Sequence, residues 1–133
     1  MLRINLLHSR LSIIDLRQRS NQPFVIGSYV IIFNGEIYNF ESLRKNLNIQ
    51  NTKFSTNSDT EVLLKYYIKY GVRCLEYFEG MWSFAIYNKI NGELFLARDR
   101  FGEKPLFYFK DNQNFYFGSE IKYLKSLINQ NLK

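Results

Sequence analysis

The sequence has little cysteine, little proline and no cluster of metal-binding side chains. One residue of 133 is cysteine, Cys74, and two are proline, Pro23 and Pro105. A lone cysteine excludes an internal disulfide, and neither a Cys-x-x-Cys pair nor a Cys/His cluster is present to bind a metal. We therefore predict no metal site and a reducing compartment, the cytoplasm.

Long apolar runs and basic runs are also missing. No window reaches the roughly 18 consecutive apolar residues that a membrane-spanning helix needs, and the N-terminus carries no signal-peptide pattern. The formal charge is +6, but the 18 Lys and Arg residues are scattered without a run of five or six. Because a nucleic-acid site needs a basic stripe, the sequence predicts neither a nucleic-acid partner nor a membrane partner.

Apolar and aromatic residues, in contrast, are abundant. They make up 46% and 17% of the chain, which is too much apolar surface for a disordered polymer. No Gly/Ser-rich linker, repeat or low-complexity tract divides the sequence. We predict one globular domain over residues 1–133.

The first half of the chain predicts strands followed by helices. Apolar stretches at Ile4–Leu7 and Tyr29–Phe33 predict two strands, the second of which ends at an Asn34-Gly35 turn. Helical spacing of apolar residues predicts a short helix over Phe40–Leu47, with Asn39 as its N-cap. A second helix is predicted to start at Asp59, where Ser58 and Glu61 have capping-box spacing, and to stop at Gly71 before a further helical turn.

The second half predicts a strand meander and a final helix. Met81–Tyr87 is apolar on both alternations, which is typical of a strand covered on both faces. Asn91-Gly92 predicts a hairpin turn into a strand over residues 94–97, and residues 111–112 predict a second hairpin, between Leu106–Phe109 and Phe115–Phe117. A helix over Glu120–Ile128 follows. Strands, two helices, a meander and a last helix predict a segregated α+β fold.

Four short polar segments stand at the ends of these predicted elements. Their sequences are HSRLSIID at His8–Asp15, FNGEIYN at Phe33–Asn39, TNSDTE at Thr56–Glu61 and ARDRFG at Ala97–Gly102. In order and wording they resemble the glutaminase domain of asparagine synthetases, a class II glutamine amidotransferase. The QPF at Gln22–Phe24 and the FGSE at Phe117–Glu120 extend the resemblance over nearly the whole chain.

This resemblance implies a fold and an activity. The fold is the four-layer αββα sandwich of the N-terminal-nucleophile hydrolases, here expected to lack its first strand. The activity is hydrolysis of L-glutamine to glutamate and ammonia, which a synthetase domain then uses for ATP-dependent amidation of aspartate to asparagine. We expect no cofactor in this chain, because ATP and Mg²⁺ belong to the synthetase domain, which this sequence does not include.

The resemblance also assigns the two charged ends of the substrate. A free amino acid carries a carboxylate and an ammonium, so a selective pocket needs a forked cation and an anion. The resemblance gives these roles to Arg10 and Asp59. The main chain lining the carboxylate end is then that of Leu11, Ser12, Ile13 and Ile14. The alternatives are a structural ion pair for Arg10 and, for Asp59, a helix-dipole contact worth about 0.3–1 kcal/mol.

The family's oxyanion hole corresponds to the side-chain amide of Asn34 and the backbone N–H of Gly35, since attack on the substrate amide builds negative charge on its oxygen. Glu36 corresponds to a residue that holds the polar groups of glutamine. Without the resemblance, Asn-Gly is a tight turn and Glu36 a surface glutamate. Arg98 and Asp99 we assign to structure, as a buried pair that frames a loop.

The family's nucleophile is a cysteine at the first position after removal of the initiator Met, and here Leu2 follows Met1. Cys74 lies in a predicted helical segment, so we expect it to be buried and inert. We therefore expect a truncated chain that is inactive alone, with an unpaired sheet edge that favours self-association into a homo-oligomer. A non-catalytic glutamine-binding module or remnant, or an amidotransferase of a cell-surface polysaccharide pathway, remains an open alternative.

Overall fold

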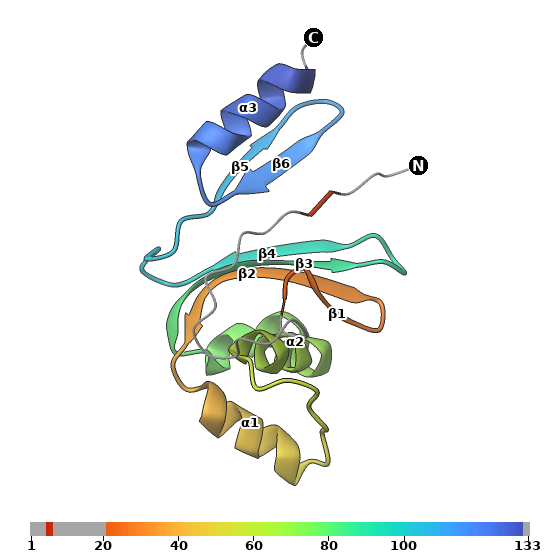
Figure 1. The fold of residues 1–133 in the computed structure, drawn as a ribbon, viewed down its shortest axis with the longest axis vertical. Coiled ribbons are helices and arrows are strands. Elements are labelled where there is room, and N and C mark those ends of the chain that lie inside the picture. Colours follow the sequence, from red (N-terminus) through yellow and green to blue (C-terminus); the bar gives the residue numbers. More distant parts are fainter. Residues whose placement is uncertain (1–4, 7–20, 132–133) are drawn as a thin grey trace.

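The computed structural model describes residues 5–6 and 21–131, which form a mixed α+β fold (Figure 1). The predicted α+β class is confirmed. Of the predicted strand Ile4–Leu7, the first and last residues lie outside the described residues, and residues 5–6 are not in a strand. In chain order the elements are β1 Phe24–Ile26, β2 Tyr29–Ile37, α1 Phe40–Ile49, α2 Asp59–Tyr70, the 3₁₀ helix η2 Gly71–Tyr77, β3 Gly80–Asn88, β4 Leu94–Arg98, β5 Phe107–Lys110, β6 Phe115–Gly118 and α3 Ile121–Asn131.

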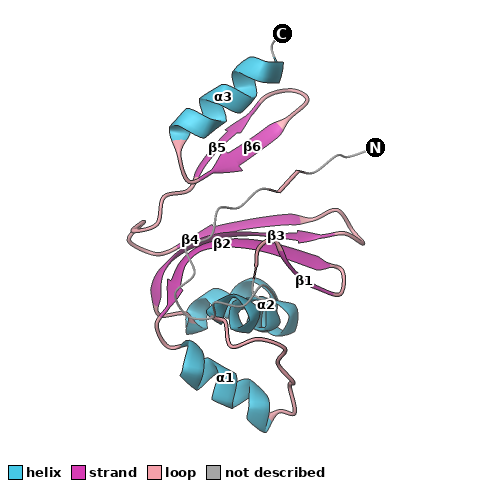
Figure 2. Cartoon of the chain, viewed as in Figure 1, coloured by secondary structure: helices cyan, strands magenta, loops and turns pink. Residues whose placement is uncertain are grey.

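Four strands form an antiparallel sheet in the order β1-β2-β3-β4. Because side chains alternate between the two faces of a strand, residues 31, 33 and 37 of β2 share one face. That face packs against α2, and α1 lies beyond α2 (Figure 2). The core between sheet and helix is fully buried; it includes Ile31, Phe33, Ile37, Val62, Leu63, Tyr66 and Phe84.

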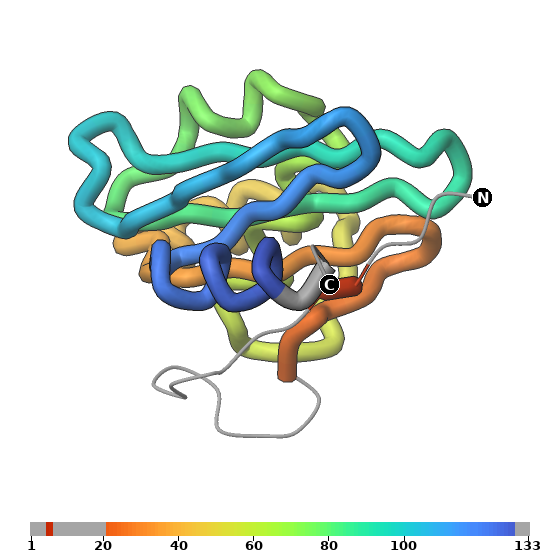
Figure 3. Tube along the Cα trace, turned by 90° about the horizontal axis from the view of Figure 1, so that it is seen from above, coloured from red at the N-terminus to blue at the C-terminus, as the bar shows by residue number. Residues whose placement is uncertain are grey.

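The β5–β6 hairpin and α3 lie on the other side of the sheet (Figures 1 and 3). Leu124 of α3 covers the hairpin at Gly118, where an added Cβ would lie 3.6 Å from a Leu124 methyl. A cavity of about 390 Å³ separates the hairpin from β4; its lining includes Leu96, Arg98, Tyr108 and Phe115. Both predicted hairpins and the last helix are confirmed, but the hairpin and the large sheet are not closely packed at this cavity.

The predicted turn at Asn34-Gly35 is wrong, because β2 continues through both residues to Ile37. Gly35 has φ +140°, and a Cβ there would lie 2.1 Å from the carbonyl oxygen of Met81 on β3. Glycine is therefore required for the close approach of two strands, and not for a turn. The buried strand predicted over Met81–Tyr87 is confirmed as part of β3.

Helix α2 starts and stops where the sequence predicts. The Ser58 hydroxyl accepts the N–H of Glu61 at 3.3 Å, and Gly71, at φ 59°, ends the helix. The second contact of the predicted capping box, from the Glu61 side chain to the Ser58 backbone, is wrong. The Glu61 carboxylate accepts N–H groups of the preceding loop instead. Asn39 precedes α1 as predicted but makes no side-chain cap; its amide bonds Tyr77 O at 2.9 Å.

Candidate functional site

The end of β2 extends beyond its pairing with β1, and along this part no strand among the described residues covers its outer edge. In an antiparallel ladder, the groups of successive residues point alternately to the two neighbouring strands. Just past β2, the Tyr38 N–H donates to Glu79 O, next to β3, at 2.7 Å. The backbone N–H groups of the even-numbered residues of β2 therefore point toward β3. The N–H groups of Phe33, Gly35 and Ile37 point to the opposite edge of the strand.

On that opposite side, β1 pairs with β2 only as far as Ile31. Beyond it, the Gln22 side chain takes the place of a strand partner. Its Nε2 donates to Phe33 O at 3.0 Å, and its Oε1 accepts the Phe33 N–H at 2.5 Å. Among the described residues, the next N–H along this edge, that of Gly35, faces no strand.

The Asp59 carboxylate closes the other end of this edge. It is only 6% exposed, and it accepts the Ile37 N–H at 3.2 Å and the Thr60 N–H at 2.9 Å. Burial raises the pKa of Asp59 above its ordinary value, and the nearby negative charge of Glu36 adds to that effect. No Lys or Arg in the described part of the chain forms an ion pair with it. Within the described part of the chain, the Asp59 carboxylate is compensated by backbone N–H groups and the helix N-terminus.

Asn34 and Glu36 project from the same strand toward the hairpin side of the sheet. The side-chain amide of Asn34 donates to the Ser119 hydroxyl at 3.3 Å, just before α3. Its cross-strand partner Ser83 is buried and donates to Pro105 O at 3.2 Å. An amide nitrogen carries two donors, and the described residues accept one of them.

The structure therefore brings four predicted site residues together at the end of β2: Asn34, Gly35, Glu36 and Asp59. Arg10 and the main chain of residues 11–14 lie outside the described residues. Sequence reasoning gave no role to Gln22, although it noticed the QPF segment. A polar residue placed just before a short edge strand was the available signal.

The predicted Arg98–Asp99 pair is wrong, although a structural role in the loop fits both residues. Arg98 is exposed and donates to Lys104 O at 2.9 Å and to Gly102 O at 2.5 Å. Burial opposes ionisation of Asp99, but four backbone N–H donors outweigh it and lower the pKa of Asp99. These donors belong to Lys104, Glu103, Trp82 and Phe101.

Cys74 is fully buried in the core, and burial raises the pKa of its thiol to about 12. Such a thiol carries almost no thiolate at neutral pH, so it cannot serve as the nucleophile. Within residues 5–6 and 21–131, no three His, Cys, Asp or Glu side chains gather to hold a metal ion. None of the helices in this part of the chain has the length and apolarity to cross a membrane.

Comparison with known proteins decides the family. A sequence model of the glutamine amidotransferase domain matches residues 2–133. The chain belongs to the class II glutamine amidotransferase family. This amidotransferase domain is 44% identical over 119 residues to "Asparagine synthetase [glutamine-hydrolyzing] 3" of Bacillus subtilis, covering 86% of this chain and 19% of that protein. It is 38% identical over 135 residues to a putative asparagine synthetase of Methanocaldococcus jannaschii, covering 90% of this chain and 26% of that one.

The amidotransferase domain also has a solved structural relative. Glutamine phosphoribosylpyrophosphate amidotransferase from Bacillus subtilis superimposes with a TM-score of 0.66 at 27% identity, over 80% of this chain and 24% of that one. The chain thus spans about a fifth to a quarter of the length of these relatives. The resemblance to asparagine synthetases expected from the motifs is confirmed.

Proposed function

We propose that this amidotransferase domain binds L-glutamine at the end of β2. The observation that carries the proposal is Asp59: a buried carboxylate with a raised pKa, without a cationic partner among the described residues, which accepts the Ile37 N–H two residues beyond Gly35 on the same strand. An α-ammonium group supplies the missing positive charge. Arg10 takes the α-carboxylate with the main chain of residues 11–14, and Glu36 holds a polar group of the substrate.

Asn34 and Gly35 are the proposed oxyanion donors. The second N–H of the Asn34 amide and the backbone N–H of Gly35 come from adjacent residues, and we propose that one carbonyl oxygen accepts from both. Donors fixed in advance stabilise the negative charge of a tetrahedral intermediate, and removal of one typically costs about 10²–10³ in rate.

In the full-length protein, we infer that glutamine and water give glutamate and ammonia, and that the ammonia amidates aspartate with ATP and Mg²⁺ bound outside this chain. The names of the Bacillus and Methanocaldococcus relatives support this assignment. We place the protein in the cytoplasm. The finer fold proposal is the αββα sandwich, supported by the succession of α3, hairpin, sheet and α2 in Figure 1. An amidotransferase of a polysaccharide pathway differs only in the ammonia acceptor.

Calorimetric titration of the chain with L-glutamine tests the binding proposal. We expect saturable binding of L-glutamine and no comparable binding of 4-carbamoylbutanoate, which is glutamine without its ammonium group. Asp59→Asn should remove the difference between the two ligands, whereas Asp111→Asn on the exposed β5–β6 turn should leave it intact. Equal affinity of the wild-type chain for both ligands would contradict the role of Asp59.

An ammonia-release assay separates the enzyme from a non-catalytic module. We expect the chain to bind glutamine without releasing ammonia, because Cys74 is the one cysteine of the sequence and its thiol is buried. Ammonia release that survives Cys74→Ala would identify another nucleophile and overturn this part of the proposal.

A further inference from the structure

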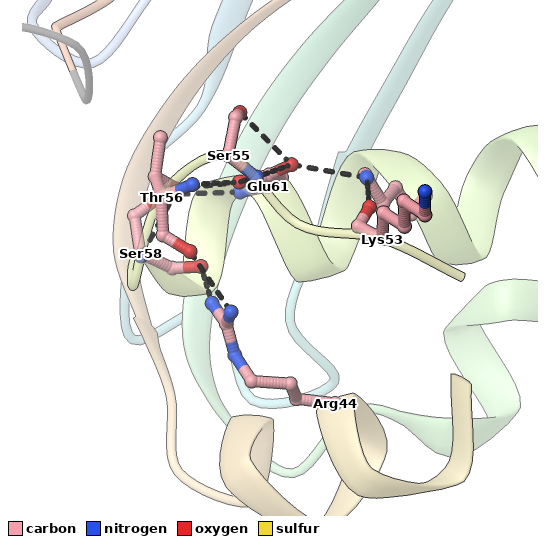
Figure 4. A network of polar contacts seen from close by, with 7 residues as sticks. Arg44, Lys53, Ser55, Thr56, Ser58 and Glu61 are labelled. Carbon is pink, nitrogen blue, oxygen red and sulfur yellow. Dashed lines mark hydrogen bonds and ion pairs between the residues drawn. The ribbon is translucent and has the colours of Figure 1, made fainter. Parts of the chain in front are cut away.

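The loop that leads into α2 has no regular secondary structure, yet two of its residues are buried and side chains hold its backbone. Thr56 and Ser58 are 2% and 3% exposed. Arg44 of α1 reaches across to this loop, with Nη1 donating to Thr56 O at 2.8 Å and Nη2 to Ser58 O at 3.2 Å (Figure 4). Its guanidinium also stacks on the Phe54 ring, with Cζ 4.3 Å from the ring centre.

These two carbonyls lie immediately before Asp59. Ser58 is the N-cap of α2, and its carbonyl belongs to the peptide group that continues into Asp59. A planar fork that binds two carbonyls of one loop fixes the direction in which the chain enters the helix. The position of the Asp59 carboxylate depends on that direction, because the carboxylate accepts the Ile37 N–H at the end of β2.

A second set of contacts holds the same loop from within. The Glu61 carboxylate accepts the N–H groups of Ser55 and Thr56 at 2.9 and 2.6 Å (Figure 4). The Lys65 ammonium forms an ion pair with the Glu61 carboxylate at 3.0 Å. It also lies over the Phe54 ring, with Nζ 4.5 Å from the ring centre. Lys65 therefore contacts the same ring as Arg44, but no hydrogen bond in the described structure joins it to the carbonyls of Thr56 or Ser58.

We propose that Arg44 is a positioning residue for the amino-acid site: by holding the carbonyls of Thr56 and Ser58, it places the Asp59 carboxylate for the substrate ammonium. The inference extends the proposed function and rests on it for the ligand. Among the described residues, Arg44 contacts the loop and the Phe54 ring. It acts through the loop. Because Arg44 belongs to α1, the position of the Asp59 carboxylate then depends on the packing of α1 against this loop.

Amide hydrogen exchange of the folded chain tests the placement without any ligand. The Ile37 N–H bonds Asp59, whereas the Ile31 N–H lies in the β1–β2 ladder of the same strand. In Arg44→Ala we expect Ile37 to exchange at least about tenfold faster relative to Ile31, a ratio that corresponds to about 1.4 kcal/mol. Arg44→Lys should restore part of the protection, since an ammonium can still reach one carbonyl.

Lys65→Met is the matched control. It removes the ion pair to Glu61 and a cation from Phe54, so it should speed exchange of Ile37 and Ile31 by the same factor through loss of global stability. An unchanged Ile37-to-Ile31 ratio in Arg44→Ala would overturn the proposal. A ratio that changes equally in Lys65→Met would overturn it as well, because loosening of the whole cluster would then explain the effect.

The affinity measurement separates this inference from the proposed function. We expect Arg44→Ala to weaken L-glutamine binding about tenfold and to leave the affinity for 4-carbamoylbutanoate unchanged. In the Asp59→Asn background, Arg44→Ala should have no further effect on the affinity for L-glutamine, since the group that it positions is gone. A wild-type chain that does not bind glutamine would refute the proposed function, while the exchange ratio would still decide whether Arg44 positions Asp59.

Discussion

Two carboxylates on the first turn of α2 have pKa values that their surroundings shift in opposite directions. Asp59 and Glu61 are 6% and 1% exposed, so both are buried. Burial opposes ionisation of Glu61, but the backbone and hydroxyl donors of Ser55 and Thr56, together with Lys65, outweigh it and lower its pKa. Asp59 accepts from backbone N–H groups, which include those of Ile37 and Thr60, but burial prevails and raises its pKa.

The difference separates a structural acid from a binding acid. Charge-assisted hydrogen bonds repay the cost of burying a carboxylate only when enough donors are present. Glu61 has its donors within the fold, and it holds the loop together. Asp59 has fewer donors among the described residues, and under the proposed function the ammonium of L-glutamine supplies the positive charge beside it. A sequence shows both as acids in a helix N-terminal turn, and only the packing tells them apart.

The largest effect is expected from Glu61→Ala. Removal of this fully buried carboxylate takes away the shared acceptor of Ser55 and Thr56 and the ion-pair partner of Lys65, which we expect to cost about 3–5 kcal/mol at pH 7. Urea unfolding followed by the fluorescence of Trp82, the one tryptophan of the chain, measures it. A loss below about 1 kcal/mol would show that the loop does not depend on Glu61.

The pH dependence of that loss has a defined sign. A carboxyl whose pKa is lowered by folding stabilises the fold fully above its unfolded pKa, close to 4.5 for Glu61, and loses this contribution as the pH falls through the lower folded value. The difference between wild type and Glu61→Ala should therefore be constant near neutral pH and shrink below pH 4.5. A difference that grows on acidification would contradict the account.

Thr56→Val makes the surroundings of Glu61 more like those of Asp59, because the Glu61 carboxylate then has fewer hydrogen-bond donors. It keeps the shape of the side chain but removes the hydroxyl that donates to Glu61 at 2.7 Å and contacts the Ser58 hydroxyl at 2.9 Å. We expect a loss of about 1.5–3 kcal/mol and a rise in the pKa of Glu61, measured by urea unfolding and by carbon NMR of the carboxyl group. A control outside the Glu61 cluster, Thr52→Val at a half-buried position, should change neither quantity appreciably.

Asp59→Asn should give the smallest change in stability, and in the opposite direction. The amide keeps an acceptor for the Ile37 N–H but removes the buried charge, so we expect a gain of about 0.5–2 kcal/mol at neutral pH. Because the pKa of Asp59 is raised by folding, wild type and variant should converge at acid pH, where the carboxyl is protonated in both states, and diverge as the pH rises through the raised pKa. Thermal melts at several pH values measure the gain, and a neutral-pH loss would contradict it.

Local signals in the sequence explain what could be predicted. The start of α2 at Ser58 and its stop at Gly71 depend on the residues at the helix ends, and the hairpin turns depend on two-residue motifs. The role of Gly35 was misread because its reason, the carbonyl of Met81, lies on another strand. The partners of Glu61 were missed for a similar cause, since the loop that carries Ser55 and Thr56 has no periodic pattern.

The candidate site was predicted from the resemblance more than from the residues themselves. An acid at a helix start and an Asn-Gly pair are both common, so neither indicates a ligand by itself. The structure adds the reason that they act together: Gly35 continues β2 along its close contact with β3, and Asp59 reaches the same strand two residues later. Gln22, which completes the edge at Phe33, was visible only as part of a motif.

The most direct test of the account is a carbon NMR titration of Asp59 and Glu61 in the same sample, with and without L-glutamine. The account predicts a pKa for Asp59 above its ordinary value that falls when L-glutamine saturates the site, because a bound ammonium favours the carboxylate. It predicts a lowered pKa for Glu61 that does not change with the ligand. An Asp59 pKa at or below its ordinary value, or one that L-glutamine leaves unchanged at saturation, would contradict the assignment of Asp59 as the ammonium site.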